Sequence, residues 1–140
     1  MNPQAAAILA AIESHPLHRF MGVDKIDAGD GIATIEIVVS EATVNARGAF
    51  HGGVAYTLCD MACYAALIGQ LAEGENAATH DLHVSLLRAA QHGDRIVTTG
   101  RVIKRGRNVA FMEAAMHCKG ELLARATVTK SILRPRGAAA

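Results

Sequence analysis

One carboxylate stands out in this sequence because it lies in the middle of an apolar stretch. Asp60 falls within residues 54–68, which are hydrophobic on nearly every side over about four predicted helical turns. Within one turn of it there is no Lys or Arg. An unpaired charge in an apolar core is costly, so such a residue is neutralised, hydrogen-bonded or used in chemistry. We interpret Asp60 as a candidate functional residue.

The glycine-rich turn before this stretch supplies a second candidate group, at a fixed distance from the carboxylate. His51 and Asp60 are nine residues apart, and at about 100° per residue they point to opposite sides of one helix. Gly52 and Asp60 are separated by about 12 Å along the axis, at about 1.5 Å per residue. If both groups serve one reaction, one chain cannot bring them together. We hypothesise a dimer in which two antiparallel central helices form two shared sites.

The composition indicates an ordinary globular chain. Its 140 residues are 51% hydrophobic and 19% charged, with a net charge of +1, which predicts one domain (1–140) and neither nucleic acid nor a membrane as partner. Two Tyr and three Phe are too few for a nucleic-acid stacking platform. The three cysteines form no CxxC motif, and His80 and His83 should lie on opposite faces of a strand. We expect reduced thiols, no metal, no cofactor and a cytoplasmic location.

Hydrophobic periodicity and glycine turns outline the elements that must position these groups. Residues 3–14 predict a helix ended by Pro16, within an N-terminal lead-in (1–18), and residues 134–140 predict a flexible tail. Between these ends, β-branched or alternating segments predict strands at 20–26, 32–39, 77–87, 95–104, 109–118 and 122–133.

The last four of these strands are joined by glycine-containing turns, which predicts an antiparallel meander. A helix that is apolar all round has to be covered, and the economical solution is an α+β fold in which a curved antiparallel sheet wraps around one long central helix. A single sheet leaves part of such a helix uncovered, so we expect a partner subunit there.

The motif Asn45-x-x-Gly48-x-x-His51-Gly52-Gly53, followed by Leu58-x-Asp60, resembles that of the hotdog-fold acyl-CoA thioesterases of the PaaI-like (phenylacetate-degradation) family. The resemblance extends over about residues 20–133. It includes the segment 79–83, the turns at 93–94 and 104–107, and the strand that follows 120–121.

The resemblance implies a role for each matching residue. The backbone N–H of Gly52 would polarise the thioester carbonyl, at a helix start where orphan N–H donors and the positive dipole end favour an oxyanion. Asn45 would add a polar contact to the carbonyl or to the neighbouring loop, and His51 would support that loop. Asp60 from the opposite subunit would act as general base or as nucleophile, two roles that the sequence does not separate. Thr79 would help to position the attacking water.

The implied substrate is an acyl-CoA, so cationic and apolar groups should contact it. Candidates for the coenzyme phosphates, which could equally be solvated surface charges, are Arg47, Arg88, Lys104, Arg105 and Arg107. Gly53 is a further candidate contact. Candidates for the acyl pocket, which could equally be tyrosines that only pack the helix, are Tyr56 and Tyr64.

We therefore predict a hydrolase that splits acyl-CoA thioesters into free acid and coenzyme A, without metal or cofactor, as a dimer of hotdog dimers (a homotetramer). One alternative is an acyl-thioester dehydratase or hydratase of the same fold, which would pair a His with an acid in a different local motif. The other is a non-catalytic module that binds acyl-CoA, although a module of this kind has no need of a buried acid. The sequence leaves the acyl group and the tetramer geometry open.

Overall fold

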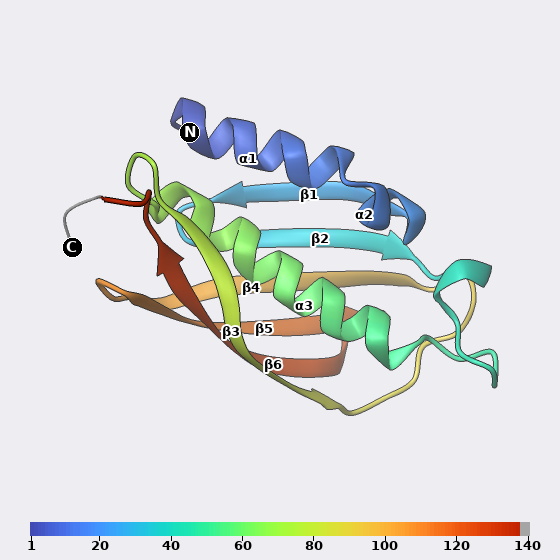
Figure 1. Cartoon of the computed structure of the whole chain (residues 1–140). Helices are drawn as coiled ribbons and strands as arrows, with labels where there is room; N and C mark the ends of the chain where they lie inside the picture. Colours follow the sequence, from blue (N-terminus) through green and yellow to red (C-terminus); the bar gives the residue numbers. More distant parts are fainter. Residues whose placement is uncertain (138–140) are drawn as a thin grey trace.

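A six-stranded antiparallel sheet curves around one long helix in the computed structural model, which describes residues 1–137 (Figure 1). This arrangement confirms the predicted α+β fold. The elements in chain order are α1 (Pro3–Ser14), α2 (Pro16–Phe20), β1 (Val23–Gly29), β2 (Ile32–Val38), the short 3₁₀ helix η1 (Glu41–Thr43), α3 (Gly52–Leu67), its 3₁₀ continuation η2 (Ile68–Gln70), β3 (Asn76–Leu86), β4 (Arg95–Arg105), β5 (Val109–Cys118) and β6 (Glu121–Leu133).

The strand order corrects the predicted four-strand meander. The sheet runs β1-β2-β4-β5-β6-β3, so only β4, β5 and β6 follow one another as a meander, while β3 pairs with β6 at the sheet edge. The reason lies in residues 87–94, which form a crossing connection rather than a tight hairpin turn. The Leu87 N–H donates to the Leu123 carbonyl, and the Ala90 carbonyl accepts from the Phe50 N–H, which ties this connection to β6 and to the loop before α3.

Helix α3 fills the concave side of the sheet and supplies much of the core. Nine of its 16 residues are buried, and it comes very close to the sheet at Gly100 of β4. A Cβ at this glycine would lie 2.5 Å from the Ala62 carbonyl oxygen and 2.7 Å from the Cys63 nitrogen. The stretch Gly52–Gln70 is long and apolar enough to cross a membrane by length and composition, but 56% of its most apolar part is buried inside this fold.

The N-terminal segment contains one element that the sequence did not predict. Helix α1 begins at Pro3, where the Asn2 side chain accepts from the Ala5 N–H, and it ends before His15 as predicted. Pro16 then starts a second short helix, α2, because the His15 ring caps it by accepting from the Leu17 N–H. The following strand therefore begins at Val23 instead of residue 20.

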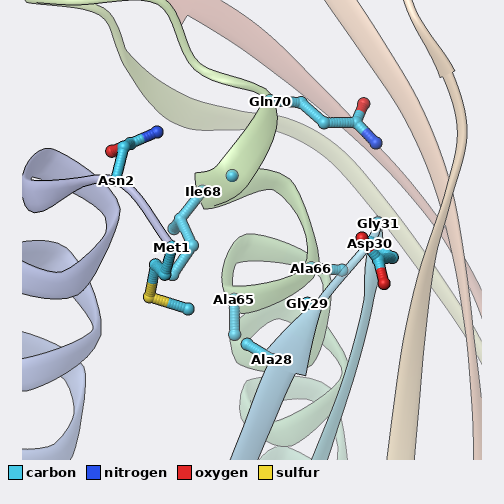
Figure 2. Close-up of a pocket in the computed structure, with 11 residues that line it drawn as sticks. Met1, Asn2, Ala28, Gly29, Asp30, Gly31, Ala65, Ala66, Ile68 and Gln70 are labelled. Carbon is cyan, nitrogen blue, oxygen red and sulfur yellow. The ribbon is translucent and has the colours of Figure 1, made fainter.

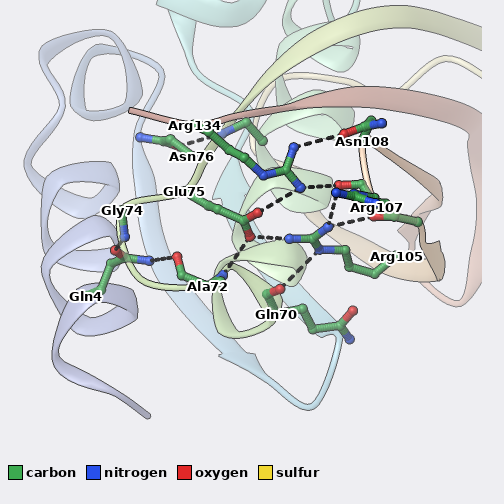
Figure 3. Close-up of polar contacts among 12 residues, drawn as sticks. Gln4, Gln70, Ala72, Gly74, Glu75, Asn76, Arg105, Arg107, Asn108 and Arg134 are labelled. Carbon is green, nitrogen blue, oxygen red and sulfur yellow. Dashed lines mark hydrogen bonds and ion pairs between the residues drawn. The ribbon is translucent and has the colours of Figure 1, made fainter. Parts of the chain in front are cut away.

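A buried ion cluster ties the far end of α3 to the end of the chain (Figure 3). The Glu75 side chain is 8% exposed and pairs with both Arg105 and Arg134. The Arg134 guanidinium also donates to the Asn108 side chain at 2.9 Å and to the Arg107 carbonyl at 2.5 Å. The predicted flexible tail (134–140) thus starts with an anchored residue, and its residues 138–140 lie outside the described part of the chain.

The close approach at Gly100 makes a stability prediction. We expect Gly100→Ala to lower the free energy of unfolding by about 2 kcal/mol or more, because the added methyl group must push helix backbone away from the sheet. Urea unfolding monitored by circular dichroism measures this loss. Gly29→Ala is the matched control, since Gly29 also lies in a strand and a Cβ there meets nothing within 4 Å. Equal midpoints for the two variants would contradict the packing described here.

The buried thiols make a second prediction. Burial, with the Asp60 charge as a smaller cause, raises the pKa of Cys59 to about 12, and burial also raises the pKa of Cys63 to about 12. A folded Cys118→Ser variant keeps only the thiols of Cys59 and Cys63. At pH 8 we expect both to react with a chromogenic disulfide reagent about a thousandfold more slowly than free cysteine. Unfolding the variant with guanidinium chloride should make both thiols react rapidly and together. Rapid reaction of the native variant would show that α3 is not enclosed as described.

Candidate active site

Asp60 has partners that the sequence analysis did not find. Its Oδ1 accepts a hydrogen bond from the Thr79 hydroxyl at 2.5 Å and an ionic hydrogen bond from Lys130 Nζ at 2.7 Å. The Asp60 side chain is 36% exposed, whereas that of Lys130 is 3% exposed. The expectation of an unpaired, buried acid is therefore wrong, because the counter-charge comes from β6, 70 residues along the chain. Asp60 is instead a paired carboxylate at the edge of the core.

Lys130 is the functional candidate that the sequence analysis missed. Along β6 the inward-facing residues Val128 and Ile132 are buried. Lys130 occupies the inward-facing position between them, and only 2% of the whole residue is exposed. Its Nζ also lies 2.7 Å from Thr79 Oγ1 and 5.5 Å from the centre of the Tyr64 ring. A lysine at an apolar position of a strand was the signal that could have identified it.

A β-bulge in β3 turns Thr79 toward the helix. Thr79 pairs with Lys130 of β6 and Asp81 pairs with Thr129, which leaves His80 as the extra residue. The extra residue breaks the simple alternation predicted for residues 77–87. Thr79 therefore shares the helix-facing side with Leu82 instead of lying opposite it. The bulge also invalidates the prediction that His80 and His83 lie on opposite faces, because His80 contacts the outward-facing Ser131.

Asp60 opens into a cavity of about 350 Å³ between α3, the sheet and the N-terminal segment. Its remaining walls come from the N-terminal lead-in, from the apolar helix α3 and from the start of β3. Besides Asp60, Thr79 and Lys130 the cavity is lined by His15, Leu17, His18, Thr57, Met61, Tyr64 and Ala77.

Of the two predicted pocket tyrosines, only Tyr64 lies in this cavity. Its hydroxyl donates to the Asn76 side chain at 2.6 Å, and burial raises the pKa of Tyr64, so the phenol is neutral. Tyr56 is 43% exposed and is not among the residues that line the Asp60 cavity.

The start of α3 is built from the glycine-rich turn. The His51 ring caps the helix, since its Nδ1 accepts from the Gly53 N–H at 2.8 Å. The His51 carbonyl accepts from Val54 N–H and Ala55 N–H. Within residues 1–137 the Gly52 N–H donates no hydrogen bond, which leaves one donor at the positive end of the helix for an incoming oxygen.

Asn45 shapes the loop that leads to this helix start. Its Oδ1 accepts from the Arg47 N–H at 2.9 Å and from the Ala49 N–H at 3.1 Å. Asn45, Arg47 and Gly52, together with Arg88, line a second cavity of about 280 Å³. The structure thus groups these four predicted residues, although Arg88 also pairs with the exposed Glu121 at 3.5 Å.

The two cavities share no residue, so one chain presents the Gly52 donor and the Asp60 carboxylate to different spaces. Asp60, Thr79, Lys130 and Tyr64 meet in one of them. The loop and helix start that surround Gly52 form the other. The separation expected from helical spacing is therefore present in the fold.

The other predicted cations lie at the opposite end of α3. The Arg105 guanidinium is occupied, because it pairs with Glu75 and donates to the carbonyls of Gln70, Gly106 and Arg107 (Figure 3). Its side chain is 18% exposed. Arg105 thus serves as an internal link, whereas Lys104 is an exposed residue of the same hairpin.

A further cavity, of about 690 Å³, is also at this end (Figure 2). It lies between the chain start, the β1–β2 turn and the end of α3, and is lined in part by Met1, Asp30 and Gln70. None of the residues predicted from the sequence to do chemistry lines it. Among residues 1–137 no group of three or more His, Cys, Asp or Glu side chains is arranged to hold a metal ion.

The chain matches the family model described as Thioesterase superfamily over residues 47–130, which include both Gly52 and Asp60. Human acyl-coenzyme A thioesterase 13 is 30% identical over 128 residues, covering 89% of this chain and 91% of the human protein.

Two solved structures share the fold. Zebrafish thioesterase superfamily member 2 superposes with a TM-score of 0.78 at 31% identity, covering 89% of this chain and 93% of its own. The Escherichia coli PaaI protein of the phenylacetic acid degradation operon has a TM-score of 0.82 at 21% identity, over 93% and 94% of the two chains. This protein therefore belongs to the thioesterase superfamily, has the hotdog fold and is a thioesterase.

Proposed function

We propose that this protein hydrolyses acyl-CoA thioesters to a free carboxylic acid and coenzyme A, without a metal or cofactor, at sites shared between two subunits. The observation that carries the proposal is the position of the Asp60 carboxylate, which Thr79 and Lys130 hold at the wall of one cavity. Gly52 of the same helix has a backbone N–H without an acceptor in the described chain and lines a second cavity. Acyl-CoA is also the substrate named for human acyl-coenzyme A thioesterase 13.

Two reaction routes fit these groups. In the first, water gives a proton to Asp60 while its oxygen attacks the carbonyl carbon, and Gly52 of the partner subunit donates its N–H to the resulting oxyanion. The C–S bond then breaks, and the proton on Asp60 passes to the coenzyme A thiolate. In the second, Asp60 attacks the carbonyl carbon and expels the thiolate, and water hydrolyses the mixed anhydride to restore the carboxylate.

An open sheet edge supports the dimer. Strand β3 is 11 residues long, lies at the edge of the sheet and pairs only with β6 within the described chain. Its free side presents unpaired backbone groups, which are a template for pairing with a second chain. Because β3 carries Thr79, pairing of two such edges about a two-fold axis would bring each Asp60 cavity to the subunit boundary.

Further assembly and location are part of the same proposal. The outer face of the sheet exposes Phe111 and Ile103, at 47% and 59%, and we assign this apolar surface to the contact between two dimers. We assign the Arg47 and Arg88 cavity to the coenzyme phosphates, since both guanidinium groups flank the Gly52 end. Three free cysteines in the described chain favour a reducing compartment such as the cytoplasm.

The rival functions fit the contacts less well. A dehydratase or hydratase would pair a histidine with an acid, but the His51 Nδ1 is engaged in capping α3, and His51 is not among the residues that line the Asp60 cavity. A module that only binds acyl-CoA gains nothing from a carboxylate fixed by a buried lysine, which costs free energy to bury.

Release of thiol from a panel of acyl-CoAs, followed with a chromogenic thiol reagent, tests this function. We expect the wild type to hydrolyse at least one aromatic or aliphatic member, and Asp60→Asn to lower kcat by several orders of magnitude. The asparagine keeps an oxygen that can accept from Thr79 and Lys130, so the variant should stay folded. Asp81→Asn is the matched control, because Asp81 is exposed on the neighbouring strand. Wild-type turnover in Asp60→Asn would refute the assignment, and tight binding without thiol release would favour the binding module.

Subunit mixing tests whether the site is shared. If it is, equal amounts of Asp60→Asn and Asn45→Ala subunits, unfolded and refolded together, should recover about a quarter of wild-type activity, since about half of the dimers then hold one intact site of two. The control mixes wild type with the Asp60→Asn/Asn45→Ala double variant. If the sites are shared, this control mixture should keep about a quarter of wild-type activity. If each site lies within one chain, the mixture should keep about a half. No recovery in the first mixture would overturn the shared site.

A further inference from the structure

Lys130 is a buried charge whose position the family assignment does not explain. It sits on the helix-facing side of β6 at 2% exposure, among apolar neighbours. A lysine in such a place is costly unless its charge is paired and its donors are used. The Lys130 charge is paired with Asp60, whose Oδ1 lies 2.7 Å from Nζ. A second donor of Nζ is used by Thr79 Oγ1, also at 2.7 Å.

The two contacts on Asp60 fall on the same oxygen. Oδ1 accepts from Thr79 at 2.5 Å and from Lys130 at 2.7 Å, while Oδ2 accepts from no residue within the described chain. Hydrogen bonds and a neighbouring positive charge stabilise electron density on the oxygen that receives them, which makes that oxygen less available to a new proton or carbon. Oδ2 is therefore the oxygen left for chemistry.

The same contacts also define what Thr79 can do. Its hydroxyl has one proton, which it donates to Asp60, and it accepts from Lys130 with one of its two lone pairs. One lone pair remains, so Thr79 can hold a water molecule only by accepting from it. Its donated hydrogen bond orients the carboxylate, and the role in positioning water that the sequence implied stays a prediction.

We propose that Lys130 is a positioning residue for hydrolysis, which fixes the orientation of the Asp60 carboxylate through Oδ1 and leaves Oδ2 as the oxygen that takes up the proton or attacks the thioester carbon. This inference rests on the proposed function. In this scheme Lys130 acts through its contacts with Asp60 and Thr79 and not by touching the substrate.

The decisive variants are Lys130→Met and Lys130→Gln, compared with Arg125→Met. Both Lys130 variants remove the charge, and the glutamine keeps a donor for Asp60. Arg125 is the matched control, because it lies on the same strand but its side chain is 57% exposed on the outer face. With an acyl-CoA that the wild type hydrolyses, we expect kcat to fall at least about tenfold in Lys130→Met, with KM within about threefold, because a misplaced carboxylate impairs the chemical step more than binding.

The kinetic pattern separates this role from a structural one. A purely structural loss reduces the amount of folded enzyme and leaves kcat per folded molecule at the wild-type value, whereas a misplaced carboxylate lowers kcat per folded molecule. We also expect Lys130→Gln, which keeps a donor for Asp60, to lose less of kcat than Lys130→Met.

The outcomes are distinct. Wild-type kcat in whichever Lys130 variant folds, as judged by circular dichroism, overturns the inference. Wild-type kcat in Arg125→Met is expected and validates the comparison. Absence of thiol release by the wild type, or an active Asp60→Asn variant, instead refutes the proposed function. Activity that depends on Asp60 but not on Lys130 refutes the positioning role alone.

Discussion

The need to enclose α3 determines the architecture of this protein. The helix is apolar on nearly every side, so the sheet has to curve around it, and the two come close enough at Gly100 that no side chain fits between them. Enclosure buries most of α3, so the two groups that we propose for chemistry lie where the helix borders a cavity. One is the capped helix start at Gly52, and the other is Asp60 in the gap between the sheet and the N-terminal segment.

Asp60 illustrates how a charge is kept at the edge of an apolar core. The cost of desolvating it is offset by a lysine and a threonine that reach it from two adjacent strands. Those strands must be in register for this to happen, and the register includes the bulge at His80. The geometry of the carboxylate thus depends on backbone irregularity as much as on side-chain identity.

Much of the fold was predictable from local sequence pattern. Strand β5 was predicted with its observed bounds, and the central helix and the turn before it were placed correctly, because alternation and glycine turns are local signals. The position of β3 beside β6 was not, since strand order depends on contacts between distant segments. For the same reason Asp60 was identified without its partner Lys130. The pairing of Arg105 with Glu75 was also not predicted, because a basic hairpin turn looks the same in sequence whether its guanidinium faces solvent or a buried acid. The phosphate contact at Arg105 stays a prediction.

The N-terminal segment has a consequence for how substrate range can diverge among relatives. His15, Leu17 and His18 line the Asp60 cavity, yet they belong to a short helical excursion that precedes the first strand. Substitutions or length changes there would remodel the cavity without disturbing strand pairing or helix burial. Under the proposed function, selectivity can therefore change in this segment while Asp60, Thr79 and Lys130 stay constant. A truncation that removes His15, Leu17 and His18 would take away this wall, so recombinant versions are best compared when they retain all three.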